Sequence, residues 1–301
     1  MNNNGLHCLF FVLKEVISSQ GIKLSESDLL LLSGGFKFKY EIEGIEGDET
    51  PRSFKIYGGE AEYSKIKQNS NILITPQKLN SKKIINDLIV LLENNITPIV
   101  YTNCFYLRFD KKNFNRNSDK HYIILNKYIP ERKEFLISDY NFKTKIQSDD
   151  LLKAMRDQKY KFLNINVTNH LSREVIIDNI FKEWQNFANS FMDTTFHNLL
   201  QFQNDIIKLL HIEYNLSREL SIYGLSKSLK HPRGPIISRK LISSNPFLSS
   251  ECRNLYYELY KMWNHFSNEL LRHAYQKSSI EEVLLIYSKI FEKEIKAASI
   301  T

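Results

Sequence analysis

Residues 5–19 have the sequence GLHCLFFVLKEVISS, in which apolar side chains recur at helical spacing from Leu9 to Ser19. Cys8 stands at the start of this predicted helix, where backbone amides that lack an intrahelical partner favour a negative charge. A thiol placed there is biased toward the thiolate, which is the reactive form of cysteine. The same residue could also be a small buried apolar side chain. Cys8 is therefore a candidate nucleophile whose role depends on its neighbours.

Two downstream residues could complete a nucleophilic site around Cys8. His121 opens a predicted strand at 121–128, after a polar and lysine-rich loop, and Asp139 closes a second predicted strand at 134–139. Antiparallel pairing of the two strands would let the carboxylate orient the imidazole toward a sulfur. Taken singly, His121 could be a surface residue and Asp139 a turn-former. Together the three residues predict a Cys–His–Asp site for acyl transfer.

The predicted secondary structure changes near residue 168, from mixed helices and strands to helices alone. Before that point, periodicity predicts helices at 25–32, 81–93 and 149–157, and strands at 36–40, 71–75, 98–101 and 160–167. After it, long helices are predicted at 174–213, 251–275 and 280–296, with a connection containing glycine and proline between the first two. We expect the α+β class: a catalytic domain with an antiparallel sheet at 1–168, then an α-helical region at 169–301 that helps to bind the substrate or its carrier.

The cysteines and the N-terminal segment bear on compartment. Three scattered cysteines do not suggest a disulfide framework, which favours a reducing environment. The first residues lack a signal-peptide pattern, and no stretch approaches the roughly 18 apolar residues of a membrane span. We therefore expect a cytoplasmic protein that does not bind a membrane. Cys104, at a predicted strand end, is a weaker rival nucleophile and Cys252 a weaker one still. No short His/Cys pairing predicts a metal site.

The chain carries a net charge of +7, and the excess is unevenly placed. No Asp or Glu occurs from Leu220 to Ser250. An ordinary bias toward lysine and a solvated connection would explain this stretch, and so would an acidic partner. Aromatic residues do not interleave with the basic ones and no nucleic-acid motif is present, so nucleic acid is the last-ranked partner. The candidate docking residues for an acidic carrier domain, or for the phosphate of its arm, are Lys227, Lys230, Arg233, Arg239 and Lys240.

Nucleotide-binding signatures are missing from the sequence. Neither the GxxxxGK[ST] loop nor the GxGxxG fingerprint occurs. The sequence therefore does not predict that the protein activates a substrate with ATP. If such a chain formed an amide, its acyl donor would have to be activated already, and a thioester is an activated acyl donor.

Five stretches of the sequence carry a resemblance to a known family. Residues 5–8 with the GGFKFKY stretch at 34–40, then 98–107, then the stretches around His121 and Asp139, resemble the butirosin biosynthesis protein H (BtrH-like) family. The likeness covers about residues 5–165 and is looser in the helical region. The family is similar to papain-fold or C39-peptidase relatives that have turned to acyl transfer, so the resemblance implies a papain-like (C39-like) catalytic domain.

The resemblance implies an acyltransferase of natural-product (antibiotic) biosynthesis. An acyl group would pass from an acyl or peptidyl carrier protein, where a 4'-phosphopantetheine thioester holds it, onto Cys8 and then onto a small amine. Amide synthesis in the closthioamide pathway, which joins carrier-bound acyl chains to a diamine, is similar in outline. No bound cofactor is implied. A cysteine peptidase that trims a leader peptide, and a non-catalytic carrier-binding module, remain alternatives.

The sequence departs from papain-like proteases near the nucleophile. Those enzymes place an oxyanion-binding Gln before the cysteine, whereas three Asn residues at 2–4 precede Cys8 here. The backbone amide of Cys8 is then the first candidate donor to the oxyanion, with Asn4 as the second. The surroundings of His121 also lack the glycines often found near such bases. Three tyrosines are candidates for a substrate wall: Tyr40, Tyr101 and Tyr106.

Overall fold

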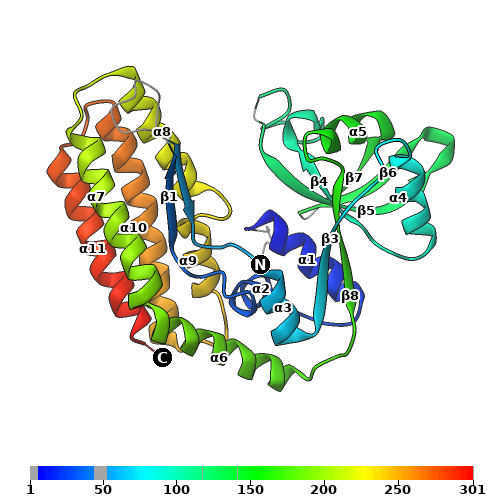
Figure 1. Cartoon of the computed structure of the whole chain (residues 1–301), viewed down its shortest axis with the longest axis horizontal. Helices are drawn as coiled ribbons and strands as arrows, with labels where there is room; N and C mark the ends of the chain where they lie inside the picture. Colours follow the sequence, from blue (N-terminus) through cyan, green and yellow to red (C-terminus); the bar gives the residue numbers. More distant parts are fainter. Residues whose placement is uncertain (1–5, 44–52, 117, 141, 301) are drawn as a thin grey trace. The chain divides into compact units, whose positions relative to one another are not determined.

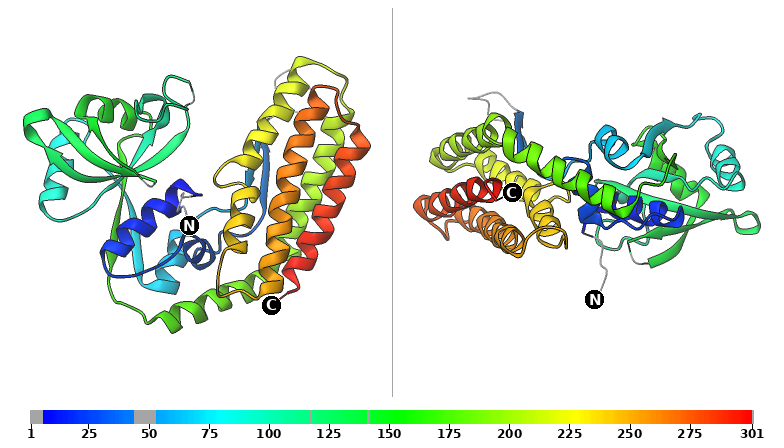
Figure 2. Two further views of the ribbon diagram at one scale, coloured as in Figure 1. Left: turned by 180° about the vertical axis from the view of Figure 1, so that it is seen from behind. Right: turned by 90° about the horizontal axis from the view of Figure 1, so that it is seen from below.

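A computed structural model describes residues 6–43, 53–116, 118–140 and 142–300. The chain divides into two compact units (Figures 1 and 2). The sheet unit comprises Met1–Leu29 and Tyr63–Leu171, and the helical unit comprises Leu30–Glu62 and Ser172–Thr301. The predicted α+β class, with an antiparallel sheet followed by a helical C-terminal region, is confirmed.

The sheet unit is built on six antiparallel strands in the order β3-β8-β4-β5-β6-β7. The strands are β3 (Ile72–Lys78), β4 (Ile99–Asn103), β5 (Lys120–Ile129), β6 (Glu134–Asp139), β7 (Phe142–Gln147) and β8 (Lys161–Val167). The α-helices are α1 (Cys8–Ser19), α3 (Tyr63–Ser70), α4 (Ile84–Glu93) and α5 (Ser148–Arg156), and α2 (Glu26–Leu32) spans the unit boundary. Single 3-10 turns follow β4 (Cys104–Tyr106) and β5 (Pro130–Arg132).

One face of the sheet forms the core under α4 and α5. Ile123, Leu125 and Ile137 belong to this buried cluster together with residues of both helices. Because side chains two positions apart on a strand point to the same face, His121 and Asp139 continue this face toward the end of the sheet. Helix α1 packs against β5 and β8 (Figure 1). The predicted element order is present: a helix that begins at the cysteine, then an antiparallel sheet that carries the histidine and the aspartate.

The predicted pairing of the His121 and Asp139 strands is confirmed as the β5–β6 hairpin. Its register pairs Ile124 with Ser138, which sets the beginning of β5 beside the end of β6. The turn ends at Lys133, whose φ of 50° lies in the left-handed region and reverses the chain. The hairpin therefore supplies both polar residues from neighbouring strand ends.

The helical unit consists of six helices of ordinary length and a two-stranded hairpin, within the described residues. The helices are α6 (Arg173–Ser190), α7 (His197–His211), α8 (Leu216–Lys230), α9 (Pro235–Ser243), α10 (Ser250–Ala274) and α11 (Ile280–Ala298), and the strands are β1 (Lys39–Glu43) and β2 (Ser53–Tyr57). Helices α7, α10 and α11 run side by side (Figure 2). The hairpin packs on α7 through β1 and on α8 through β2.

The division into units departs from the predicted boundary in one segment. Residues 30–62 group with the C-terminal helices and not with the sheet that surrounds them in sequence. The reason is aromatic packing: the Phe36 ring lies 4.7 Å from the Phe187 ring, and the Phe38 ring stacks on Trp263 at 5.5 Å. These buried rings need the helical unit to cover them.

Two helical predictions need correction. The predicted helix at 174–213 is interrupted by a π-helical turn at Met192–Phe196, which separates α6 from α7. The segment interpreted as a connection contains α8 and α9. Asn215 caps α8 by accepting from the Arg218 amide, and Pro235 occupies the first turn of α9. Helix α8 was missed because its Gly and Ser content weakens the periodic signal.

In the part of the chain that the structure describes, each helix is too short or too polar to cross a bilayer. The same residues hold no cluster of three or more His, Cys, Asp or Glu side chains that could bind a metal ion.

Candidate active site

Cys8 is the first residue of α1 and is almost fully buried. His7 caps the helix from the preceding position, because its Nδ1 accepts a hydrogen bond from the Phe10 amide at 3.3 Å. Cys8 therefore lies at the helix end where the first backbone amides have no intrahelical partner. The predicted position of Cys8 at the mouth of a helix is what the structure shows.

His121 and Asp139 lie in contact at the end of the sheet. The His121 Nε2 lies 2.9 Å from Asp139 Oδ1 and 3.0 Å from Oδ2, and Asp139 is buried. Thr102, opposite His121 on β4, donates its hydroxyl to the His121 carbonyl at 3.2 Å, which holds the strand in register. The carboxylate thereby fixes the orientation of the imidazole ring.

His121 also interacts with the Cys8 sulfur. Burial alone lowers the pKa of His121, but hydrogen bonds to Asp139 and Cys8 and the negative charge of both more than offset this and raise the pKa to about 10. Because Asp139 holds Nε2, Nδ1 is the ring nitrogen that remains for the sulfur. The structure thus brings together the three residues singled out in the sequence. Their catalytic role stays a prediction.

Glu26 was not singled out in the sequence, yet it organises the approach to Cys8. Its carboxylate accepts hydrogen bonds from the Leu6 amide at 3.1 Å and the His7 amide at 2.9 Å. Burial raises the pKa of Glu26 even though these hydrogen bonds act in the opposite direction. The helix predicted at 25–32 gave only an indirect signal: Ser25 and Asp28 cap α2 reciprocally, and this cap sets the position of Glu26 in the first turn.

Some backbone N–H groups at the start of α1 have acceptors within the protein, and the remaining ones are candidate donors to an oxyanion. Glu26 and His7 engage the amides of Leu6, His7 and Phe10. Among the described residues, the amides of Cys8 and Leu9 are the next ones at the helix end, beside the sulfur, so they can serve as donors. The role of the Cys8 amide as the first oxyanion donor stays a prediction. Asn4, the second expected donor, lies outside the described residues.

Tyr140 is the second residue that the sequence analysis missed. It follows Asp139 with a φ of 42°, a left-handed conformation that is uncommon for an aromatic residue. Its ring centroid lies 5.8 Å from that of His121 and 5.6 Å from that of Phe11. Burial, together with the negative charges of Cys8 and Asp139, raises the pKa of its hydroxyl well above the usual range. The Tyr140 ring therefore covers the imidazole and lowers the polarity around it.

Cys104 and Cys252 are both buried thiols. Cys104 lies in the 3-10 turn after β4 and accepts a hydrogen bond from the Asp119 amide at 3.4 Å, and Cys252 lies on α10. Burial raises the pKa of Cys104, and burial raises that of Cys252 to about 11. Both thiols therefore stay protonated near neutral pH and are poor nucleophiles.

The three tyrosines expected at a substrate wall are engaged in packing. Tyr40, on β1 of the helical unit, is buried and donates to Asp205 Oδ2 at 3.3 Å. The hydroxyl of Tyr101, on β4, belongs to a hydrogen-bonded group with those of Tyr63 and Tyr122. Tyr106 lies half-buried against the core under α4 and α5. Their role in substrate binding stays a prediction.

The basic residues expected at a docking surface do not share one environment. Arg239 has no exposed surface: it donates to both oxygens of the Glu294 carboxylate at 2.9 and 3.0 Å, and to the Phe36 carbonyl at 3.0 Å. Its predicted role in docking is therefore wrong, because a buried, bidentate ion pair cannot meet a partner. Lys227 and Lys230 are exposed on α8, and Arg233 and Lys240 are half-exposed.

Comparison with known proteins adds one distant likeness. No family model matches the chain, and no curated protein does. A solved structure that matches is a Bacillus anthracis protein described as a C39-like peptidase, with a TM-score of 0.36 and 14% identity over 56% of this chain and 91% of the other. A likeness of this size carries no inference about chemistry. The predicted membership of the butirosin biosynthesis protein H family stays a prediction.

Proposed function

We propose that this chain is an acyltransferase that uses Cys8 to move an acyl group from a carrier-protein thioester to an amine. The observation that carries the proposal is that one imidazole, His121, is hydrogen-bonded both to Asp139 and to Cys8, which begins a helix. A thiolate–imidazolium pair needs no metal or nucleotide to attack an activated carbonyl. The donor fits the resemblance to the butirosin biosynthesis protein H family noted above.

The first half-reaction loads the enzyme. The Cys8 thiolate attacks the thioester carbonyl, and the amides at the start of α1 stabilise the oxyanion. The bond between the carbonyl carbon and the pantetheine sulfur then breaks, and the leaving sulfur takes the proton from the His121 imidazolium. The result is an acyl-Cys8 thioester, a neutral imidazole and a free pantetheine thiol.

The second half-reaction releases an amide. The amine nitrogen attacks the acyl-Cys8 carbonyl and loses a proton to His121, and the bond to the Cys8 sulfur breaks. This step restores the thiolate and the imidazolium, while Asp139 holds the ring and balances its charge throughout. The cycle is a ping-pong sequence.

The experiment is intact-mass analysis after incubation with an acyl-loaded carrier protein. The wild-type chain should gain the mass of one acyl group, and Cys8→Ala should gain none. Cys104→Ala and Cys252→Ala are matched cysteine controls that should load like wild type. Adding an amine should discharge the adduct as an amide. Loading of Cys8→Ala would overturn the assignment of the nucleophile, and discharge to the free acid in preference to the amide would make the chain a hydrolase or peptidase.

A further inference from the structure

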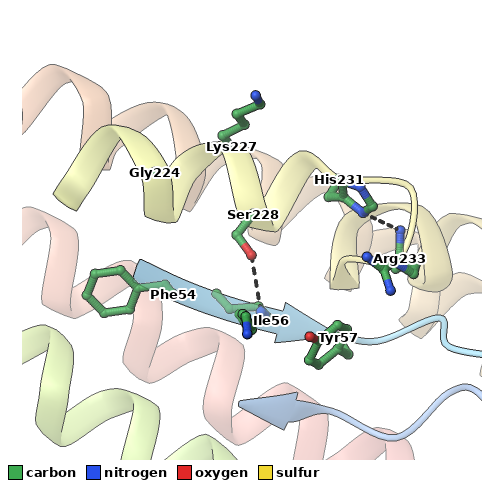
Figure 3. Close-up of a pocket in the computed structure, with 9 residues that line it drawn as sticks. Phe54, Ile56, Tyr57, Gly224, Lys227, Ser228, His231 and Arg233 are labelled. Atoms are coloured by element: carbon green, nitrogen blue, oxygen red, sulfur yellow. Dashed lines mark hydrogen bonds between the residues drawn. The ribbon is translucent and has the colours of Figure 1, made fainter. Parts of the chain in front are cut away.

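A second candidate site lies in the helical unit, whereas Cys8 belongs to the sheet unit. A cavity of about 240 Å³ opens between β2 and the segment that joins α8 to α9 (Figure 3). Four of the side chains that line it carry or can carry positive charge: Lys55, Lys227, His231 and Arg233. Among the residues that the structure describes, no Asp or Glu lines the cavity, and the sequence has none from Leu220 to Ser250.

The walls of this basic cavity are held together by direct hydrogen bonds. The Ile56 amide on β2 donates to the Ser228 hydroxyl oxygen on α8 at 3.1 Å (Figure 3). The Gly58 amide, just past β2, donates to the Arg233 carbonyl at 2.7 Å. A side chain at Gly58 would meet Pro235 at 2.9 Å, so the strand end and the α8–α9 turn touch closely. The cavity is therefore pre-formed, which lowers the entropy cost of binding.

Two basic groups are oriented within the cavity. The Arg233 guanidinium lies over the Tyr57 ring at 5.5 Å, a cation–π contact that restricts its rotation. The Arg233 amide donates to His231 Nδ1 at 3.2 Å, which fixes the orientation of the imidazole ring (Figure 3). The Ser228 oxygen accepts from Ile56, which leaves its own hydrogen to donate. These groups are donors, as an anion requires.

Stabilisation of the α8 helix dipole explains only part of the positive charge that lines the cavity. Lys227 lies in the last turn of α8, where a cation stabilises the helix dipole. Its side chain extends away from β2 at the rim (Figure 3). Lys55 pairs with Glu43 on the neighbouring strand, so a ligand would compete with that carboxylate for it. His231 is the C-cap residue of α8, whereas Arg233 lies beyond the helix end, where the dipole does not account for its charge.

We propose that the basic cavity binds the phosphate of a phosphate ester. Planar guanidinium groups match phosphate oxygens bidentately, and Lys and His add charge-assisted hydrogen bonds. Pockets for whole drug-sized ligands measure about 300–1,000 Å³, so a cavity of about 240 Å³ suits one phosphate group and its attached atoms. The phosphate could come from a free phosphorylated metabolite or from the prosthetic arm of a carrier protein.

The test compares probes that differ in the phosphate. Calorimetric titration with 4'-phosphopantetheine should show binding, and titration with pantetheine, which lacks the phosphate, should show affinity at least about tenfold weaker. Arg233→Gln combined with His231→Gln should lower the affinity for 4'-phosphopantetheine by at least about tenfold. Lys261→Gln is the matched control, because Lys261 is an exposed cation on α10 that lies over the Tyr257 ring and does not line the cavity. The control should bind like wild type.

Additional titrations distinguish the two sources of the phosphate, and additional variants control for misfolding. If the holo carrier protein binds more tightly than its apo form, and the double variant loses this difference, the phosphate belongs to a carrier arm. If the holo and apo forms bind equally while the chain still binds 4'-phosphopantetheine, the phosphate belongs to a free metabolite. Arg233→Lys keeps the charge and should retain partial binding if the double variant fails to fold. Cys8→Ala should bind unchanged, so the result does not depend on the proposed acyl transfer. Equal affinity for the two probes, or an equal loss in Lys261→Gln, would overturn the proposal.

Discussion

At the scale of single residues, the charge state of His121 governs the candidate site. The imidazole lies between two groups that can both be negative, the Asp139 carboxylate and the Cys8 sulfur. Their charges raise its pKa to about 10, although burial acts against this. The pair should therefore hold the imidazolium form across the neutral range.

This shift predicts a pH dependence of stability. The His121 pKa is about 10 in the folded chain and about 6.5 when unfolded, so its contribution is fully present below about pH 6.5 and is lost as the pH rises toward 10. Urea midpoints measured from pH 6 to 10 should fall for wild type and fall less for His121→Gln. An identical slope in both proteins would contradict the assigned shift.

The same residue should control the reactivity of Cys8. Removing the imidazole leaves the sulfur without its counter-charge, so the rate of Cys8 alkylation by iodoacetamide near pH 7 should fall by about tenfold or more in His121→Ala. Peptide mapping identifies the labelled cysteine, and Cys104 and Cys252 should stay unlabelled because burial raises their pKa values. Rapid labelling of Cys8 in the variant would show that the imidazole does not activate it.

Glu26 should act as a positioning residue for the nucleophile. Glu26→Ala removes the acceptor for the Leu6 and His7 amides and should lower the rate of acyl-Cys8 formation by roughly tenfold, because a small misplacement of a reacting group is costly. Glu26→Gln keeps one acceptor oxygen and should recover part of the rate. Glu15→Ala, at an exposed position on α1, is the control and should load normally. Equal loading of all three variants would exclude the role.

At the scale of elements, the Arg239–Glu294 ion pair ties α9 to α11. Arg239 also donates to the Phe36 carbonyl, and Glu294 accepts from the Trp263 indole at 2.8 Å. A buried ion pair whose hydrogen bonds are all made costs the fold little free energy. Removing one partner leaves the other as a buried charge without a counter-charge, which lowers stability strongly.

Glu294→Ala should therefore lower the free energy of unfolding by roughly 3–5 kcal/mol. Glu292→Ala, two residues earlier on the exposed side of α11, should change it by no more than about 0.5 kcal/mol. Urea denaturation followed by circular dichroism measures both. Similar midpoints for the two variants would mean that Arg239 finds another partner.

Elements with strong periodicity were predictable, and elements defined by partners were not. The helix that begins at Cys8 and the hairpin of β5 and β6 follow from local patterns. Strand β2 and helix α8 did not stand out, because β2 is short and α8 has small polar residues on much of its surface. Their conformation depends on the packing of one against the other.

At the scale of the whole molecule, residues 30–62 belong with the helices at the far end of the chain. A chain that ends at Leu171 would leave Phe36 and Phe38 without their partners, and each ring contributes about 1.5–3 kcal/mol when buried. We expect this truncated chain to bind a hydrophobic dye and to associate on size-exclusion chromatography. A monomeric truncated chain that binds no dye would show that the segment is stable without the helical unit.

The sequence by itself determined the candidate nucleophile, its base and its carboxylate, because each lies at the end of an element with a clear local period. It also determined the α+β order of the elements. Only the tertiary structure decided that Glu26 holds the chain before Cys8, that Tyr140 covers His121, and that Arg239 is buried. The physical reason is that these features arise from contacts between residues far apart in the chain, where burial and charge depend on neighbours that no local pattern specifies.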